Sequence, residues 1–461
     1  MARTTLPSPD RDGGGLERDT IAAVATPPGR GGIGIVRVSG PDALAILARV
    51  CGREAASRAP IVAHFRDAAG QPIDHGIALA FPAPHSFTGE HVAELHGHGG
   101  PIVMDLLLGA TLNCGARLAR PGEFTERAFL NGKMDLAQAE AVADLIASRS
   151  EAAARSALRS LSGVFSERVR AVAQDMLDLR VYVEGAIDFP EDDVDFLSEG
   201  RVPERLERLV GTLLSLIETA TQGVILNEGV TLVLAGRPNV GKSSLLNRLL
   251  GFDRAIVTDT AGTTRDTLSE SMDLNGVPIR VVDTAGLRIA GDAIEREGIR
   301  RARDEIEEAD LVLLVRDCGS RETVEELVAE QSLPSERLVV VTNKIDLANG
   351  IAGEVAGQTR PEIAISALTG AGIDALERAI LRAVGRSEEA GVFSARRRHL
   401  DALNQACAIL QRGAEALRTA GAGELLADDL RRAHEQLGEI VGSVSSDALL
   451  GEIFSRFCIG K

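Results

Sequence analysis

The residues with the clearest chemistry form the run Gly236 to Ser244, with the sequence GRPNVGKSS. The run fits the pattern GxxxxGK[ST], in which glycines let backbone N–H groups converge on phosphate oxygens. In such a loop Lys242 adds a positive charge at the β and γ phosphates, and the hydroxyl of Ser243 binds Mg²⁺. The predicted phosphate contacts are Asn239, Val240, Gly241, Lys242, Ser243 and Ser244.

Three later motifs complete the pattern. Ile279 to Gly286 reads as a strand that delivers Asp283 to Mg²⁺, directly or through water. Leu338 to Asp346 reads as a buried strand ending in NKxD. The carboxylate of Asp346 can accept two N–H bonds from guanine, a donor pair that adenine lacks. Ser366 to Leu368 can supply a backbone N–H to the guanine oxygen. These motifs, in this order, predict a GTPase of the translation-factor-like class with further contacts from Asp283, Thr284, Ala285, Gly286, Asn343, Lys344, Ile345, Asp346, Ser366, Ala367 and Leu368.

A hydroxyl-rich segment, Thr258 to Asp266, lies between the loop and the second motif and reads as a first switch that covers Mg²⁺ and the γ-phosphate. Thr264 is the expected second Mg²⁺ ligand. Leu287 follows the DTAG motif where many GTPases place a water-orienting Gln, so hydrolysis must recruit another group. The switch residues predicted to contact the nucleotide are Thr258, Asp259, Thr260, Ala261, Gly262, Thr263 and Thr264.

The elements around these motifs follow from apolar spacing. A strand-like Val230 to Ala235 precedes the loop, and an apolar helical pattern follows it. Apolar residues at steps of three and four from Leu161 to Val183 predict one long amphipathic helix, and a second stripe runs from Leu400 to Leu417. We expect the two stripes to pack together, so that the nucleotide domain is inserted in a helical bundle. Two separate helical domains are the alternative.

The predicted fold class is therefore multidomain α/β plus α, with an N-terminal α/β domain and a helical bundle interrupted by a Ras-like P-loop GTPase domain. Short β-like runs alternate with helical patterns in the N-terminal domain. The predicted boundaries are a disordered tail at 1–18, the N-terminal domain at 19–120, the first helical part at 121–227, the GTPase domain at 228–386, and the second helical part at 387–461, ending in the sequence CIGK.

Composition limits the partners and the compartment. A formal net charge of −17 argues against a surface that binds nucleic acid everywhere, although Arg396 to Arg398 could form a local basic patch. The five cysteines show no CxxC pair, which favours a reducing compartment. No apolar stretch approaches the roughly 20 residues of a membrane span, and the N-terminus lacks a secretory signal. We therefore expect a cytoplasmic protein without a membrane partner.

From Asp19 to Lys461 the chain resembles the family of tRNA-modifying GTPases called MnmE or TrmE. The resemblance is carried by Ala25 to Gly32 (ATPPGRGG), by Arg120 to Lys133 (RPGEFTERAFLNGK) and by the terminal Phe457 to Lys461 (FCIGK). It implies a potassium-stimulated homodimer. With an FAD- and NADH-using partner of the MnmG type, in a heterotetramer, such a protein forms 5-carboxymethylaminomethyluridine at the tRNA wobble position. No flavin motif occurs in this chain, which fits redox chemistry carried by the partner.

The resemblance also implies roles for particular residues. Glu295 would orient the attacking water through a bridging water. The first domain would bind a reduced folate, methylene- or formyl-tetrahydrofolate, and would also mediate dimerisation. A carboxylate suits the paired N–H groups of a pterin, and Arg and Lys suit the anionic glutamyl tail. The implied potassium ligands are Asn239, Thr258, Thr260 and Thr263, and the implied folate contacts are Arg37, Glu94, Lys133 and Lys461.

Other interpretations are weaker. Gly29 to Gly34 matches GxGxxG, but Ile33 to Val38 reads as a strand where a dinucleotide-binding helix should begin. Four histidines between His85 and His98 lack the companions of a usual zinc site. Cys458 has no evident His partner that would make it a nucleophile. The rival function is a ribosome-assembly GTPase that acts as a switch without modification chemistry.

Overall fold

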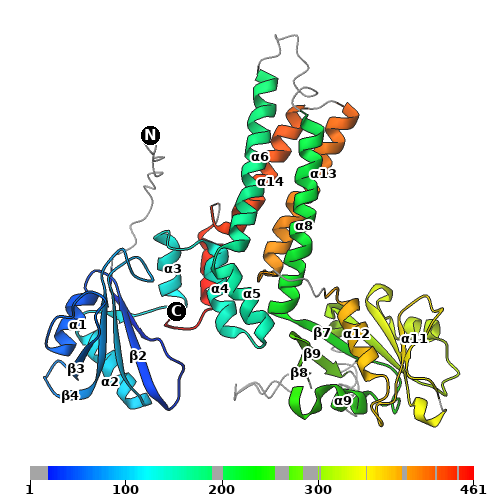
Figure 1. The fold of residues 1–461 in the computed structure, drawn as a ribbon, viewed down its shortest axis with the longest axis horizontal. Coiled ribbons are helices and arrows are strands. Elements are labelled where there is room, and N and C mark those ends of the chain that lie inside the picture. The colour runs from blue at the N-terminus through cyan, green and yellow to red at the C-terminus, as the bar shows by residue number, and fades with distance from the viewer. Residues whose placement is uncertain are drawn as a thin grey trace. The chain divides into compact units, whose positions relative to one another are not determined.

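The computed structural model describes residues 19–188, 201–254, 269–283, 300, 303–348, 350–386, 392–420, 423–443 and 446–460. The chain divides into two compact units, Met1–Ala139 with Ser445–Lys461, and Glu140–Val444. The first unit therefore joins the two ends of the chain, and the second contains both the helical bundle and the nucleotide domain (Figure 1).

One six-stranded sheet in the order β3-β4-β5-β2-β1-β6 forms the body of the first unit. Its pairs are antiparallel except β1 with β6. The helices α1 (Ala43–Cys51) and α2 (Pro101–Asn113) pack on the face that carries Val36 and Leu95. The strand expected after Gly32 is confirmed, since β2 runs through this segment. The strands are β1 Ile21–Val24, β2 Gly31–Ser39, β3 Ile61–Arg66, β4 Pro72–Phe81, β5 Val92–Gly99 and β6 Arg117–Leu118.

The C-terminal segment belongs to this first unit. Helix α15 (Asp447–Ser455) places Phe454 against Phe129 of α3 (Glu123–Leu130), with ring centroids 6.4 Å apart. The N–H of Gly122 donates to the carbonyl of Cys458 at 3.3 Å. Gly460 has a φ of 97°, and a Cβ there would lie 2.3 Å from the carbonyl oxygen of Val24. The penultimate glycine therefore allows the tail to approach β1 closely.

Long helices from both sides of the nucleotide domain form the bundle of the second unit. Helix α13 packs against α14 and α8, and α14 packs against α6. The long amphipathic helix predicted from Leu161 to Val183 is confirmed as α6 except at its start, because α5 ends at Leu161 and Gly163, with a φ of 95°, separates it from α6. The helices are α4 Leu136–Ala147, α5 Glu151–Leu161, α6 Val164–Asp188, α8 Val202–Glu228, α13 Arg397–Ala420 and α14 Gly423–Val441.

Helix α8 corrects the expectation that no apolar stretch approaches the length of a membrane span. By length and composition its 27 residues could cross a membrane, and half of its most apolar 18-residue stretch is buried inside the protein. Leu206, Leu213 and Ala220 of this helix are buried. A core helix of a bundle needs the same apolar composition, so the pattern is weak evidence for a membrane.

The nucleotide domain is a seven-stranded sheet in the order β12-β13-β11-β10-β7-β9-β8, with antiparallel pairs only at its two edges. Helices α9 (Lys242–Arg254) and α12 (Ile373–Ala383) cover one face, and α11 (Val324–Gln331) covers the other. Central parallel strands are buried on both faces and therefore read as continuous apolar runs. The strands are β7 Val230–Ala235, β8 Ser269–Leu274, β9 Val277–Asp283, β10 Leu311–Asp317, β11 Leu338–Asn343, β12 Gly353–Glu354 and β13 Glu362–Ala364.

A buried ionic cluster joins α4 to the start of α13. The carboxylate of Glu140, with 1% of its side chain exposed, accepts hydrogen bonds from Arg398 and, at 2.7 Å, from Nε2 of His399. Arg396 pairs with Asp144 at 2.7 Å, while Arg397 pairs with Glu228 and with Asp310 of the nucleotide domain. The expectation of a basic patch at Arg396 to Arg398 is therefore wrong, since each arginine is engaged by carboxylates.

The protonation states in this cluster follow from its contacts. Burial alone would raise the pKa of Glu140, but the hydrogen bonds from His399 and Arg398 and the positive charge of Arg398 outweigh it and lower this pKa. Burial lowers the pKa of His399. The N–H of Arg396 donates to Nδ1 of His399, so the neutral ring carries its proton on Nε2 and donates to Glu140.

Replacing the carboxylate of Glu140 by an amide should destabilise the second unit. Glu140→Gln leaves the half-buried Arg398 without its charged partner and removes the carboxylate that accepts from the buried His399, which costs about 1–3 kcal/mol. When the pH is lowered, the unfolded state of the parent chain takes up protons before the folded state does, because the pKa values of Glu140 and His399 are lowered in the folded state. The free energy of unfolding should therefore begin to fall below about pH 6.5, where unfolded His399 takes up a proton, and fall further below about pH 4.5, where unfolded Glu140 does. Urea unfolding at several pH values measures both effects. Glu415→Gln, in an exposed pair with Arg418, is the control and should change little. Unchanged stability of Glu140→Gln would contradict the prediction.

Candidate GTP-binding site

The loop from Gly236 to Gly241 joins β7 to α9 and is shaped by its glycines. Gly236 has a φ of 133°, and a Cβ there would lie 2.2 Å from the carbonyl oxygen of Val315. Gly241 has a φ of 97°, and a Cβ there would lie 2.3 Å from Nδ2 of Asn343. No other residue type fits these two positions without moving neighbouring strands.

The residues predicted to contact the phosphates and Mg²⁺ lie at the end of this loop and beside it. Lys242 is buried, and its Nζ donates to the carbonyls of Gly236 and Arg237 at 2.9 Å each, across the phosphate loop. The hydroxyl of Ser243 donates to Oδ2 of Asp283 at 3.3 Å. A hydroxyl and a carboxylate are oxygen ligands of the kind that Mg²⁺ prefers, so the donor set fits this ion.

The NKxD segment ties the guanine side to the phosphate loop. Asn343 is buried, and its Nδ2 donates to the carbonyl of Val240 at 2.9 Å while its Oδ1 accepts from the N–H of Ala367 at 3.0 Å. Lys344 donates from Nζ to the carbonyl of Asn239 at 2.8 Å. The side chain of Asp346 accepts a hydrogen bond from the hydroxyl of Ser366. Three motifs that are far apart in the sequence therefore hold one another in place.

These segments surround a cavity of about 780 Å³. Its size suits a nucleotide, since small-molecule sites measure about 300–1,000 Å³. Asp346 lies in the lining together with Ala367 and Leu368, as the guanine assignment requires. The lining residues are Gly241, Ser244, Asn247, Arg248, Gly251, Asn343, Lys344, Asp346, Leu347, Ala367 and Leu368.

Two residues of this site were missed by sequence reasoning. Arg248 of α9 donates from Nε to the carbonyl of Ala367 at 3.1 Å, which fixes the segment that faces guanine. Asp317 pairs with Lys344 at 2.7 Å, and hydrogen bonding with that lysine lowers the pKa of Asp317. No motif marked either position. The sequence indicated only that Arg248 lies on the helix after the phosphate loop and that Asp317 lies at the end of an apolar strand.

Many of the predicted site residues lie outside the described residues. They include the proposed water-orienting Glu295, the Mg²⁺ ligand Thr264, three of the four potassium ligands and Lys461. The complete set is Thr258, Asp259, Thr260, Ala261, Gly262, Thr263, Thr264, Thr284, Ala285, Gly286, Glu295 and Lys461. Asn239, the remaining residue of the implied potassium site, is exposed and has a left-handed φ of 63°.

Two of the predicted folate residues meet on the sheet of the first unit. Arg37 of β2 lies opposite Glu94 of β5, and its Nε donates to Oε1 of Glu94 at 3.0 Å. The guanidinium also lies 5.6 Å from the ring centroid of Phe87. Lys133 donates from Nζ to the carbonyl of Pro84 at 3.1 Å, on the loop that carries Phe87. A charged pair beside an aromatic ring has the polar and apolar character that a pterin ring requires.

Comparisons with known proteins agree with the domain content. Residues 136–458 match the MnmE helical domain, and residues 20–133 match the GTP-binding protein TrmE N-terminus. The chain is 53% identical to the tRNA modification GTPase MnmE of Nitrosococcus oceani over 96% of this chain and 97% of that protein. It is 52% identical to the MnmE of Pseudomonas aeruginosa, covering 96% of this chain and 99% of the relative.

Among solved structures, the G domain of the T. maritima FeoB iron transporter is 27% identical, with a TM-score of 0.26 over 33% of this chain and 98% of that one. The matches to the helical and N-terminal domains, and the identity over nearly the whole length, establish the family. The chain therefore belongs to the MnmE family of tRNA modification GTPases.

Proposed function

We propose that this GTP hydrolase of tRNA modification forms 5-carboxymethylaminomethyluridine at the wobble position, together with an FAD- and NADH-dependent enzyme of the MnmG type. A reduced folate would supply the one-carbon unit, and the active form would be a cytoplasmic homodimer within a heterotetramer. The observation that carries the GTPase part is the convergence of the phosphate loop and the NKxD segment around one cavity, with Asp283 hydrogen-bonded to Ser243 at the end of that loop. The modification part is supported by family membership and by the contact between Arg37 and Glu94.

In this proposal the residues of the chain bind and orient GTP. Asp346 and a backbone N–H of the segment Ser366 to Leu368 recognise guanine, and Lys242 leaves its loop carbonyls to contact the β and γ phosphates. Ser243 and Asp283 would hold Mg²⁺, which neutralises negative charge that develops on the transferred phosphoryl. Glu295 would orient the attacking water, a role that Leu287 cannot perform because its side chain is apolar.

Asn239 is the described residue on which the potassium proposal can be tested. Its position at the left-handed turn of the phosphate loop exposes the side-chain oxygen beside the phosphates. Asn239→Ala removes that oxygen and should abolish the difference in GTP turnover between potassium and sodium buffers. Steady-state hydrolysis in both salts measures it. Asn247→Ala, which changes an amide elsewhere in the lining of the cavity, should keep the potassium effect. Stimulation that survives in Asn239→Ala would remove this residue from the ion site.

Mass spectrometry of wobble nucleosides tests the function as a whole. Cells that lack this chain should lose 5-carboxymethylaminomethyluridine, and the intact gene should restore it. Reduced folate should bind the purified dimer in equilibrium dialysis, and Glu94→Gln should weaken that binding. Normal wobble nucleosides in the deletion strain, together with absent folate binding, would favour the ribosome-assembly switch.

A further inference from the structure

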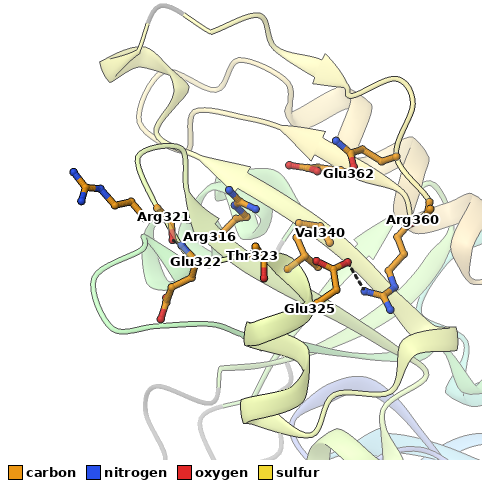
Figure 2. A pocket seen from close by; sticks show the side chains of 12 residues that line it. Arg316, Arg321, Glu322, Thr323, Glu325, Val340, Arg360 and Glu362 are labelled. Atoms are coloured by element: carbon orange, nitrogen blue, oxygen red, sulfur yellow. Dashed lines mark hydrogen bonds and ion pairs between the residues drawn. The ribbon is translucent and has the colours of Figure 1, made fainter.

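A second cavity, of about 390 Å³, lies on the face of the nucleotide domain that carries α11 (Figure 2). It is bounded by the end of β10, by β11, by the start of α11 and by the segment before β13. None of its lining residues lines the GTP cavity. The lining residues are Arg316, Ser320, Arg321, Glu322, Thr323, Val324, Glu325, Val340, Gln358, Thr359, Arg360 and Glu362.

Two guanidinium nitrogens in this lining are buried without a hydrogen-bond acceptor. They are Nε of Arg316 and Nη1 of Arg360, and they are the only side-chain nitrogens in that condition among the residues that the structure describes. A buried donor without an acceptor is destabilising, and more so when it is charged. Both unsatisfied donors therefore point to an acceptor that occupies the same cavity.

The carboxylates of the lining already have other partners. Arg237 holds Glu322 at 2.7 Å, and Thr342 donates to Glu362 at 2.6 Å. Glu325 is 73% exposed and lies 3.9 Å from Nη1 of Arg360, at the limit of an ion pair. Within the described parts of the chain, Arg316 has neither a hydrogen bond nor an ion pair from its side chain. Inside the cavity, Arg316 is therefore a cation without a partner among the described residues, and Nη1 of Arg360 has only the carboxylate of Glu325 at 3.9 Å.

We propose that this cavity binds a small molecule that bears a phosphate group. Guanidinium groups bind phosphate through paired N–H bonds, and the hydroxyls of Ser320 and Thr359 add donors at the lining. A nucleic acid backbone fits less well, because the exposed Glu325 would repel a run of phosphates at the surface and the chain carries a net charge of −17.

The cavity is also linked to the guanine side of the GTP site. Arg316 precedes Asp317, which pairs with Lys344, and Thr342, the partner of Glu362, precedes Asn343. Arg316 and Thr342 each lie one residue before the end of a strand, β10 and β11, that leads into the nucleotide site. A ligand bound to Arg316 would therefore lie close to that site. The cavity must be tested with GDP in place, so that its own binding is separated from that at the phosphate loop.

Calorimetric titration of the GDP-loaded full chain with inorganic phosphate tests the proposal. The parent chain should show saturable binding with one phosphate per chain. Arg316→Gln and Arg360→Gln should each weaken it by about 10-fold or more, because each removes a charged hydrogen bond. Arg382→Gln, in an exposed pair with Glu354 outside the cavity, is the control and should bind phosphate as the parent does.

Three outcomes would overturn the proposal. The first is a parent chain without saturable phosphate binding. The second is binding that persists in both Arg316→Gln and Arg360→Gln, which would place the phosphate beside GDP. The third is a short ribo-oligonucleotide that displaces phosphate and itself depends on Arg316. If thermal unfolding shows that Arg316→Gln is not folded, Arg360→Gln decides alone, since Arg360 lies outside the strands. GTP hydrolysis is measured separately and does not depend on this result.

Discussion

Asp346→Asn is expected to weaken GTP binding by about 100-fold to 10,000-fold. The carboxylate can accept two N–H bonds from guanine, each worth about 1.5–3 kcal/mol because the acceptor is charged. An Asn side chain offers one acceptor and one donor in the same place. The variant should therefore prefer xanthosine triphosphate, whose base carries an oxygen where guanine carries the amino group. Competition binding with both nucleotides measures the change.

The control for this exchange is a carboxylate on the same domain but away from the cavity. Glu354→Gln changes an exposed residue of β12 that pairs with Arg382, and it should leave the affinity for GTP unchanged. Asp346 also accepts a hydrogen bond from Ser366, so thermal unfolding of Asp346→Asn should be recorded beside binding. A folded Asp346→Asn chain that keeps parental GTP affinity would refute the assignment of the guanine contact.

Lys242→Ala should lower GTP turnover by about 1,000-fold, the loss typical for removal of one preorganised donor to a developing negative charge. The lysine also bridges the carbonyls of Gly236 and Arg237, so its removal leaves the phosphate loop less ordered as well as less positive. Single-turnover hydrolysis at saturating GTP separates the chemical step from binding.

Arg378→Ala is the matched control for this variant, since it removes an exposed cation from α12 of the same domain. It should hydrolyse GTP at the parental rate. Turnover of Lys242→Ala within about 10-fold of the parent would contradict the role of this lysine. The expected loss of modified wobble uridine in cells that carry Lys242→Ala follows from the proposed function and would be a second readout.

The motifs and strands of the nucleotide domain could be predicted well because each depends on residues that are close together in the sequence. Each motif lies where a strand meets a loop, and buried parallel strands such as Leu311–Asp317 read as unbroken apolar runs. The break between α5 and α6 was not predicted, because apolar spacing continues through Gly163 and only its left-handed φ separates the helices. The short strand Arg117–Leu118 was also missed, since two exposed residues carry no periodic pattern.

Long-range charge pairs were beyond the reach of the sequence. Arg396, Arg397 and Arg398 look like a basic patch in the chain, yet the fold brings carboxylates to all three, including Glu140 from more than 250 residues away. The potassium, magnesium, folate and partner assignments remain predictions, and the domain boundaries and individual site residues do as well.

The family, the guanine preference expected from Asp346 and the order of the nucleotide motifs could be read from the amino-acid sequence, because spacing within a strand–loop–helix unit is a local property. The folded chain was needed to find that Asn343 links the phosphate loop to Ala367, that Glu140 and His399 share a buried hydrogen bond, and that Arg316 and Arg360 line one cavity. Burial and pairing depend on which distant segments pack together, and a spacing pattern does not contain that information.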